Sequence, residues 1–546
     1  MSSTPALRVQ TWLRATAARA ETLSDLKVWG LSALIGVATA YGVLGFTIVI
    51  ELITDYAYGA PSEMLADGAR DQGSLRLFLV PVIGGVLVGL LLYLSKRAGL
   101  INDIRCQGVS EVIEARARPP GAISFRGGLI NTLVCATALG TGSSAGREGP
   151  AVLLGGAVSV WFSKTFGLSA KDSRTLLGCA AAAAVSAAFN APIAGVLFAL
   201  EVILSNYALS IFAPIALSSI IATLITRYHL GELHRFVIPE YGGAAPLDLF
   251  LGGASGIAAG VVAIAFLSFA AWGRSVARVA VSRVHIPPAV MPAVAGVGMG
   301  GVALVQPELL GYGYQATSAA LEGSYTLQLM LILLVGKIFT SVLCLSCRFG
   351  TGVFSGGIYL GAMAGAAFGI IMGDAFGGLV ASPTFFAIVG MGAVSGAIIG
   401  APISTTLIIF ELTGDYTMTA ALMIAVGIAS VMTQIFFGTS WFHFQLNQRG
   451  YDLSEGPQGV ILQTIRVRDV MRPVPDTAAP LEDSAERLYA TQSLGEALAE
   501  MGRLDLDAMP VTAGKGESKL LGTVTQLRAL RAYNKALVDS HIEHHR

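Results

Sequence analysis

Charged residues are scarce in this chain of 546 residues. Only 13% are Asp, Glu, Lys or Arg, whereas a soluble protein carries about a quarter. Hydrophobic residues make up 54% of the sequence, and the formal net charge is zero. This composition excludes an ordinary soluble protein. Because no dense basic cluster is present, it also argues against nucleic acid as a partner.

Cysteine and histidine are rare as well, with 5 and 7 residues. Cys344 and Cys347 form a CxxC motif, but no second pair or histidine stands near it, so we expect buried thiols rather than a metal site. Ser255 lies in a Gly-x-Ser-Gly sequence, the basis of a remote alternative, an intramembrane serine protease. Such chemistry needs a base, and no histidine lies within a clearly apolar run. We therefore expect no enzyme, no catalytic residue, no metal and no cofactor.

Long apolar runs dominate the sequence instead. A membrane-spanning helix needs about 20 apolar residues, and seven runs approach that length: 28–50, 76–95, 175–204, 211–226, 249–272, 326–345 and 418–437. The chain is a predicted multi-pass protein of the plasma (inner) membrane. The first run follows a mixed-charge segment, so we expect no cleavable signal peptide. The Lys/Arg bias of the loops places 51–74 outside, 96–126 inside and both termini in the cytoplasm.

Other apolar segments are too short or too rich in glycine to span as straight helices: 109–117, 123–139, 150–162 and 353–371. Broken helices at membrane depth are tolerated where they line a cavity or are buried in protein. An internal repeat agrees with this pattern, because the Ala-Val-Ser, Ala-Pro-Ile and Glu of 184–201 recur in 393–411. Paired halves with matching breaks indicate a transport site at their interface.

The repeat and the change of composition after it divide the chain into five predicted parts. They are a cytoplasmic N-terminal helix (1–27), a first membrane repeat (28–227), a linker (228–246), a second membrane repeat (247–450) and a cytoplasmic domain (451–546). Glu201 and Glu411 close the two copies of the repeated motif. We interpret them as structural acids at helix ends rather than as ligands of a cation transporter.

The segment 140–150 reads Gly-Thr-Gly-Ser-Ser-Ala-Gly-Arg-Glu-Gly-Pro and lies between two apolar stretches. Arg147 and Glu148 therefore stand at membrane depth, where a charge costs roughly 2.5–3.5 kcal/mol on insertion scales. Pro150 suits the first turn of a helix, and the free amides at a helix start bind anions. Glu148 is thus an acid placed where an anion should bind. The alternative is a purely structural Arg147–Glu148 pair.

The sequence resembles the CLC family of chloride channels and chloride/proton exchangers over 28–450. The motifs that carry the resemblance are Gly108-Val109-x-Glu111, Gly146-Arg147-Glu148-Gly149-Pro150, Asn190-Ala191-Pro192, Gly352-Val353-Phe354 and Gly400-Ala401-Pro402. It implies an α-helical membrane protein with an inverted repeat of tilted and broken helices. It also implies a homodimer in the lipid bilayer that transports chloride or other small monovalent anions.

The resemblance also implies roles for single residues. The glutamate that matches Glu148 serves the family as gate and proton acceptor. The anion pathway would be lined by Gln107, Gly108, Val109, Arg147, Gly149, Val353, Phe354 and Phe442. Gln107 stands where the family often has serine, Phe442 where it has a pore tyrosine, and the sequence after Phe354 lacks the family's proline. Val202 occupies the proton-transfer position of exchangers. We therefore predict passive, channel-like conduction, with an antiporter using an unconventional proton path as the alternative.

The last hundred residues are more charged and predict a small α/β domain. We expect strands in 458–470 and 520–525, and amphipathic helices in 493–502 and 526–538. The segments 467–471, 509–511 and 521–525 resemble a CBS module. Arg528 stands where a nucleotide-binding acid would be expected, so we predict a dimerisation or regulatory role instead of nucleotide binding.

Overall fold

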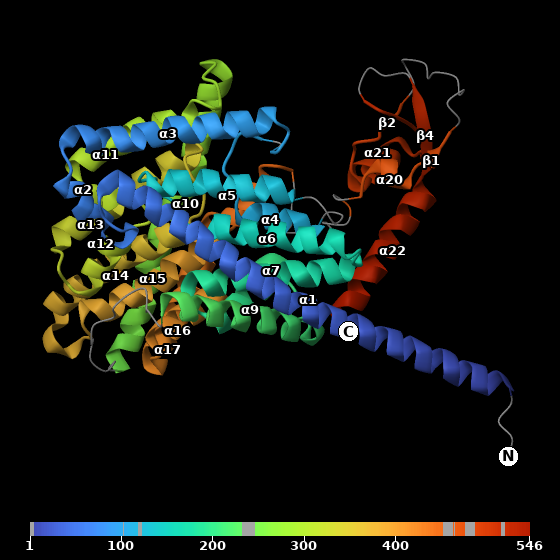
Figure 1. Cartoon of the computed structure of the whole chain (residues 1–546), viewed down its shortest axis with the longest axis horizontal. Helices are drawn as coiled ribbons and strands as arrows, with labels where there is room; N and C mark the ends of the chain where they lie inside the picture. The colour runs from blue at the N-terminus through green and yellow to red at the C-terminus, as the bar shows by residue number, and fades with distance from the viewer. Residues whose placement is uncertain are drawn as a thin grey trace. The chain divides into compact units, whose positions relative to one another are not determined.

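The computed structural model describes residues 5–101, 103–117, 123–231, 246–450, 462, 465–474, 486–514 and 519–545. Its internal contacts divide the chain into a membrane unit, which extends to Trp441, and a C-terminal unit, which consists mainly of the residues from Phe442 onward (Figure 1). Most of the predicted linker, residues 232–245, lies outside the described residues.

The membrane unit is built of helices. They are α1 (Pro5–Tyr58), η1 (Ser62–Met64), α2 (Leu65–Asp71), α3 (Ser74–Arg97), α4 (Val109–Ala117), α5 (Phe125–Gly140), α6 (Glu148–Thr165), α7 (Ala170–Phe189), α8 (Pro192–Phe198), η2 (Ala199–Leu204), α9 (Leu209–Leu230), α10 (Pro246–Arg283), α11 (Met291–Val305), η3 (Pro307–Leu309), α12 (Tyr314–Leu321), α13 (Leu327–Ser346), α14 (Phe354–Phe376), η4 (Gly377–Leu379), α15 (Pro383–Ile399), α16 (Pro402–Thr413) and α17 (Tyr416–Phe436). Helix α18 (Trp441–Asn447) begins at the last residue of this unit. Among the described residues, 7 helices are long and apolar enough to cross a membrane.

The structure differs from the predicted segments in three places. The N-terminal helix predicted over 1–27 continues without a break into the first apolar run, because α1 spans both. The run 175–204 is not one span, since α7 ends at Phe189 and Pro192 opens α8. Proline has no amide to continue the hydrogen bonds of the preceding helix. Conversely, the segment 353–371 is not broken: Val353 is the N-cap of α14, and 354–371 lies within this helix of 23 residues.

The glycines of α14 serve packing rather than bending. A Cβ on Gly361 would lie 2.1 Å from the Gly390 carbonyl oxygen, and one on Gly365 would lie 2.0 Å from that of Phe386. Both acceptors belong to α15, so the two helices touch backbone to backbone, as small residues permit in membrane proteins. The sequence shows the glycines but not the partner helix that explains them.

The two copies of the sequence repeat adopt the same local structure. Asn190 ends α7 with a φ of 57°, and Gly400 ends α15 with a φ of 72°. Both values are left-handed, a conformation that glycine and asparagine tolerate at the end of a helix. Pro192 and Pro402 then open α8 and α16. The repeated motif therefore encodes a repeated helix break.

The glutamates that close the repeat bind each other's half of the protein. Glu411 accepts hydrogen bonds from the amides of Ile193 (3.0 Å) and Ala194 (2.8 Å) at the start of α8. Glu201 accepts them from Ile403 (3.1 Å) and Ser404 (2.8 Å) at the start of α16. A carboxylate at a helix start satisfies free amides and opposes the helix dipole. Their prediction as helix-end acids is confirmed.

Replacing either acid should loosen this reciprocal contact. Glu201→Ala and Glu411→Ala are each expected to lower the free energy of unfolding by about 0.5–2 kcal/mol, the usual cost of losing a helix cap. Thermal unfolding in detergent, followed by intrinsic fluorescence, measures the loss against the exposed Glu322→Ala. Unchanged midpoints in both variants would show that water or lipid satisfies these amides equally well.

The C-terminal unit contains a small mixed α/β fold. Its elements after α18 are α20 (Val467–Val470), β1 (Arg472–Pro473), β2 (Leu488–Tyr489), α21 (Leu494–Leu504), β3 (Ala508–Thr512), β4 (Leu520–Thr525) and α22 (Gln526–His545). The strand order is β1-β4-β3-β2, with only the β2–β3 pair parallel. Of the strand predicted over 458–470, residues 458–461, 463 and 464 lie outside the described residues. Residues 467–470 form the helical turn α20 instead, where the Asp469 side chain accepts the Arg466 amide (3.1 Å).

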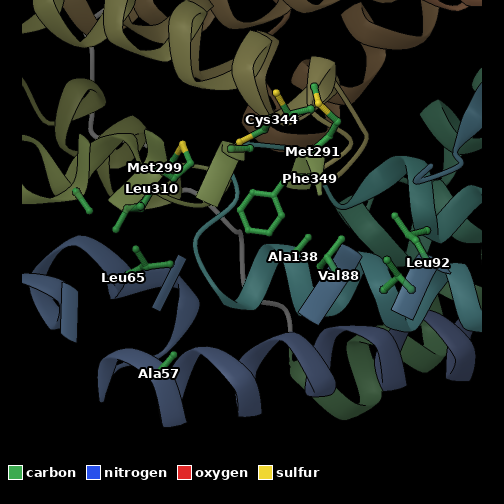
Figure 2. Close-up of a cluster of buried hydrophobic side chains, with 14 of the residues drawn as sticks. Ala57, Leu65, Val88, Leu92, Ala138, Met291, Met299, Leu310, Cys344 and Phe349 are labelled. Atoms are coloured by element: carbon green, nitrogen blue, oxygen red, sulfur yellow. The ribbon is translucent and has the colours of Figure 1, made fainter. Parts of the chain in front are cut away.

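A buried apolar cluster in the membrane unit supports the loop that precedes α14. Figure 2 shows the Phe349 ring of this loop among Val88, Ala138 and Met291. Cys344 and Cys347 belong to the same cluster as buried free thiols. The predicted packing role of the CxxC motif is therefore confirmed, and the cluster fixes the chain where α14 begins.

Candidate functional site

The predicted gate segment and the start of α14 meet backbone to backbone. The Gly146 amide donates a hydrogen bond to the Gly352 carbonyl oxygen (3.0 Å). Gly352 has a φ of 95°, and a Cβ there would lie 2.4 Å from the Gly146 oxygen, so both conformation and space require glycine. The start of α4 joins them, because a Cβ on Gly108 would lie 3.5 Å from the Gly149 Cα atom.

Glu148 lies between two helix starts. It is the first residue of α6, it is 5% exposed, and the Ser355 hydroxyl near the start of α14 donates a hydrogen bond to its Oε1. The backbone amides of Glu148 and Ser355 lie against the same carboxylate. Its Oε2 is buried without a hydrogen-bond partner in the described part of the chain. One carboxylate oxygen is thus well held, while the other stays unsatisfied at a cost of about 1–3 kcal/mol.

Arg147 turns away from its neighbour. Its guanidinium donates to the Tyr314 hydroxyl (3.2 Å) and to the Ala188 carbonyl oxygen (3.3 Å). It also lies 5.5 and 5.4 Å from the ring centroids of Tyr312 and Tyr314, within cation–π range. Over the described residues, no ion pair joins Arg147 to Glu148. The alternative of a structural Arg147–Glu148 pair is therefore not what the structure shows.

The loop that carries the two tyrosines is anchored by a buried lysine. Lys337 of α13 is 1% exposed, donates to the Gly311 carbonyl oxygen (2.7 Å) and lies 4.8 Å from the Tyr359 ring centroid. A carbonyl dipole and an aromatic face are the groups that satisfy an ammonium ion away from water. Lys337 therefore supports the loop whose tyrosines hold Arg147.

A cavity of about 520 Å³ reaches Arg147 from the side of the predicted outer loop. Its wall includes the acids Glu51, Asp55 and Glu63. The Ser62 hydroxyl is hydrogen-bonded to both Glu51 and Tyr312, so wall and arginine belong to one network. The cavity wall therefore combines a buried cation with carboxylates that are more exposed.

The start of α4, predicted to line the anion pathway, is held by neighbouring protein groups. Asn131 holds the Gln107 peptide by accepting from its amide (2.9 Å) and donating to its carbonyl oxygen (3.0 Å). The Gly108 amide donates to Glu111 Oε2 (2.6 Å). These two amides are therefore occupied by protein groups. The half-buried Gln107 side chain makes no hydrogen bond within the described residues, which leaves its amide group as a free donor; Val109 is buried.

The other predicted residues are placed as follows. Val353 and Phe354 are buried at the start of α14, where the Phe354 ring packs edge-on against Phe189 with centroids 4.9 Å apart. Phe442 is buried in α18, and its place in the pathway stays a prediction. Val202 is buried in η2, a π-helical turn packed against α7 and α8. Turns of this kind are frequent at functional sites.

Sequence reasoning missed four residues of the site, Ser355, Tyr312, Tyr314 and Asn131. Ser355 directly follows the Gly352-Val353-Phe354 motif, where the sequence analysis considers only the absence of the family's proline. The Gly-Tyr-Gly-Tyr sequence of 311–314 could have drawn attention, because paired aromatic residues between glycines are suited to holding a cation. Asn131 has no comparable local signal.

The comparisons with known proteins identify the family of this chain. The family model described as "Voltage gated chloride channel" matches residues 84–434. The chain belongs to the CLC family. The match covers the helix starts of α4, α6 and α14, together with the broken helix pairs of both repeats.

Relatives in the CLC family carry the names of both channels and exchangers. The chloride channel protein CLC-e of Arabidopsis thaliana is 30% identical over 426 residues, 73% of this chain and 59% of that protein. A ClcB-like chloride channel protein of Ralstonia nicotianae is 29% identical over 399 residues, 72% of this chain and 91% of its own length. The H⁺/Cl⁻ exchange transporter ClcA of Vibrio cholerae is 32% identical over 310 residues, 55% of this chain and 65% of that protein. The matched part thus spans less than two thirds of two of these relatives.

Two solved structures show the same fold. A slow cyanobacterial Cl⁻/H⁺ antiporter superposes with a TM-score of 0.67 at 21% identity, covering 77% of this chain and 97% of that one. A eukaryotic CLC transporter gives a TM-score of 0.64 at 17% identity, with 92% and 98% covered. At such identities the likeness establishes the CLC fold and leaves the activity to be argued from the site.

Proposed function

We propose that this CLC-family protein conducts chloride and other small monovalent anions across the plasma (inner) membrane, with Glu148 as its gate. The observation that carries the proposal is the Glu148 carboxylate itself. It occupies the space between the starts of α6 and α14, held by the Ser355 hydroxyl, while its Oε2 lacks a partner among the described residues. Donors arranged this way suit any small anion, so a carboxylate there competes directly with the transported ion.

Channel-like conduction is our preferred mode of transport. Val202 cannot carry a proton, and Glu201 beside it is bound to the amides of Ile403 and Ser404. The alternative is an antiporter in which water brings protons to Glu148 by another path. The relatives named as exchangers keep that alternative open.

We also propose that the protein forms a homodimer and that both of its termini lie in the cytoplasm. Ile193 and Ile403 are 55% and 48% exposed at the neighbouring starts of α8 and α16, an apolar surface that suits a second copy of the chain or lipid. The C-terminal α/β unit would be the CBS-like cytoplasmic domain. Arg528 is exposed there, and we assign this domain a dimerisation or regulatory role without a nucleotide.

Anion efflux from liposomes tests the proposed function. The purified protein is expected to release both chloride and nitrate, with rates within about tenfold, or roughly 1.4 kcal/mol. Backbone amides and the Gln107 side chain would be the donors, and such groups discriminate weakly among monovalent anions. Efflux no faster than from empty liposomes, with either anion, would contradict the proposed transport. Efflux of one anion only would show that a specific contact selects it.

A further inference from the structure

We infer that Cys106 and Cys135 form a reversible redox pair, in which oxidation to a disulfide slows anion conduction by tying the segment before α4 to α5. The oxidant would be a small-molecule disulfide such as oxidised glutathione. The expected effect on flux rests on the proposed anion transport, whereas formation of the disulfide does not depend on it.

The Cys106 and Cys135 side chains are neighbours that come from different elements. Cys106 lies in the irregular segment before α4, and Cys135 lies in α5. Both thiols are free, and they are hydrogen-bonded to one another. Asn131, one helical turn before Cys135, donates to the Cys135 Sγ atom (3.8 Å) and also holds the Gln107 peptide. The residue after Cys106 is therefore fixed to the face of α5 that carries Cys135.

The two thiols differ in their access to solvent. Cys106 is half-buried, whereas Cys135 is fully buried. The Asp103 side chain of the same segment is 52% exposed, and the Lys/Arg bias places the loop 96–126 in the cytoplasm. An accessible cysteine beside a buried resolving cysteine is the arrangement of a thiol that senses oxidation. In the reducing cytoplasm both thiols would be free at rest.

The oxidation consists of two thiol–disulfide exchanges. The Cys106 thiolate attacks one sulfur of the small disulfide, whose S–S bond breaks and releases one small thiol. The Cys135 thiolate then attacks the Cys106 Sγ atom, breaks the mixed disulfide and releases the second small thiol. The two protons lost by the cysteines end on the released thiols. The protein thus loses two electrons, and the small disulfide gains them.

Oxidation would change the contacts beside Gln107. In the reduced protein the Cys106 thiol donates to the Arg348 carbonyl oxygen (3.5 Å), and the Arg348 side chain donates to the Ile104 carbonyl oxygen. These two bonds join the segment before α4 to the loop before α14. A disulfide sulfur has no proton to donate, so the bond from Cys106 to Arg348 would be lost. The segment would be tied covalently to α5 instead.

The loop before α14 depends on such contacts. Arg348 has a φ of 63°, a left-handed value that residues other than glycine keep only where their surroundings hold it. The Cys106 thiol is part of those surroundings. A few residues further on, the Gly352 carbonyl oxygen accepts the Gly146 amide beside Glu148 (3.0 Å). The disulfide is therefore expected to disturb the starts of both α4 and α14, which are predicted to line the anion pathway.

Oxidation of the purified protein tests the pair. The full-length protein is treated with oxidised glutathione in detergent, its disulfides are mapped by protease digestion and mass spectrometry, and the rest is reconstituted into liposomes. We expect a Cys106–Cys135 crosslink and chloride efflux slowed about fivefold, the low end of usual coupling between sites. Reduction before reconstitution should restore the rate.

Serine variants identify the role of each thiol. Cys106→Ser should prevent both the crosslink and the slowing, and it should leave the reduced rate unchanged because a hydroxyl can also donate to Arg348. Cys135→Ser should carry glutathione on Cys106 instead of the crosslink, which would identify Cys106 as the attacking thiol. Cys179→Ser is the matched control, since it removes a buried thiol of α7. It should keep both the crosslink and the slowing.

The main rival partner is Cys347, because Cys106 packs against the apolar cluster that contains it. A crosslink from Cys106 to Cys347 would overturn the inference, as would the absence of any crosslink to Cys106. A complete Cys106–Cys135 crosslink with unchanged efflux would overturn the regulatory role. Absence of efflux from the reduced protein would instead contradict the proposed transport, and the mapped crosslink would still decide whether the pair forms.

Discussion

Glu148→Gln is expected to raise chloride efflux from loaded liposomes about tenfold and to remove most of its pH dependence. Glutamine keeps the shape of the side chain but has no negative charge. It therefore competes poorly with chloride for the hydrogen-bond donors between α6 and α14. A hydrogen bond to a charged group contributes about 1.5–3 kcal/mol, and a tenfold change corresponds to roughly 1.4 kcal/mol. The wild-type protein should be activated by acid, because protonation of Glu148 removes the same charge. The variant lacks the titrating group and should show a flat profile.

The matched control is Asp374→Asn, which neutralises an exposed acid near the far end of α14. It should change neither the rate nor the pH profile. Efflux is recorded with a chloride electrode at several values of external pH, at constant chloride and with the membrane voltage clamped. If Glu148→Gln behaves like Asp374→Asn, the carboxylate is not the gate, and its place between two helix starts is purely structural.

The local parts of this architecture could be predicted from the sequence because each has a local cause. Asn190 and Pro192 stop one helix and start the next through φ angles and a missing amide. The same causes act at Gly400 and Pro402, so the repeated motif predicts a helix break in each half of the membrane unit. Glu148 was recognisable for a similar reason, since its neighbours in sequence create the helix start that defines its surroundings.

The remaining features depend on contacts between residues far apart in the chain. The continuity of α14 could not be predicted, because its glycines are explained by close packing against the backbone of α15, a contact that the sequence does not show. Ser355 lies 207 residues from Glu148, and Tyr314 lies 167 residues from Arg147. The sequence alone cannot show that Arg147 bonds to a tyrosine rather than to the adjacent glutamate. Likewise, Asn131 and Glu111 accept the amides of Gln107 and Gly108, two residues predicted to line the anion pathway.

No uphill proton movement is expected when chloride flows down its gradient through the wild-type protein. Unless water supplies another path, proton transfer from the inner solution to Glu148 needs a titratable side chain as relay, and Val202 occupies the relay position implied by the family resemblance. Glu201 is a poor substitute, because its carboxylate accepts the Ile403 and Ser404 amides at 3.1 and 2.8 Å. These bonds fix the carboxylate at the start of α16. Internal pH is followed by a trapped dye under a chloride gradient at clamped voltage, with Glu201→Gln measured in parallel. Proton pumping at a fixed ratio to chloride would establish the antiporter instead, and its loss in Glu201→Gln would identify Glu201 as the relay.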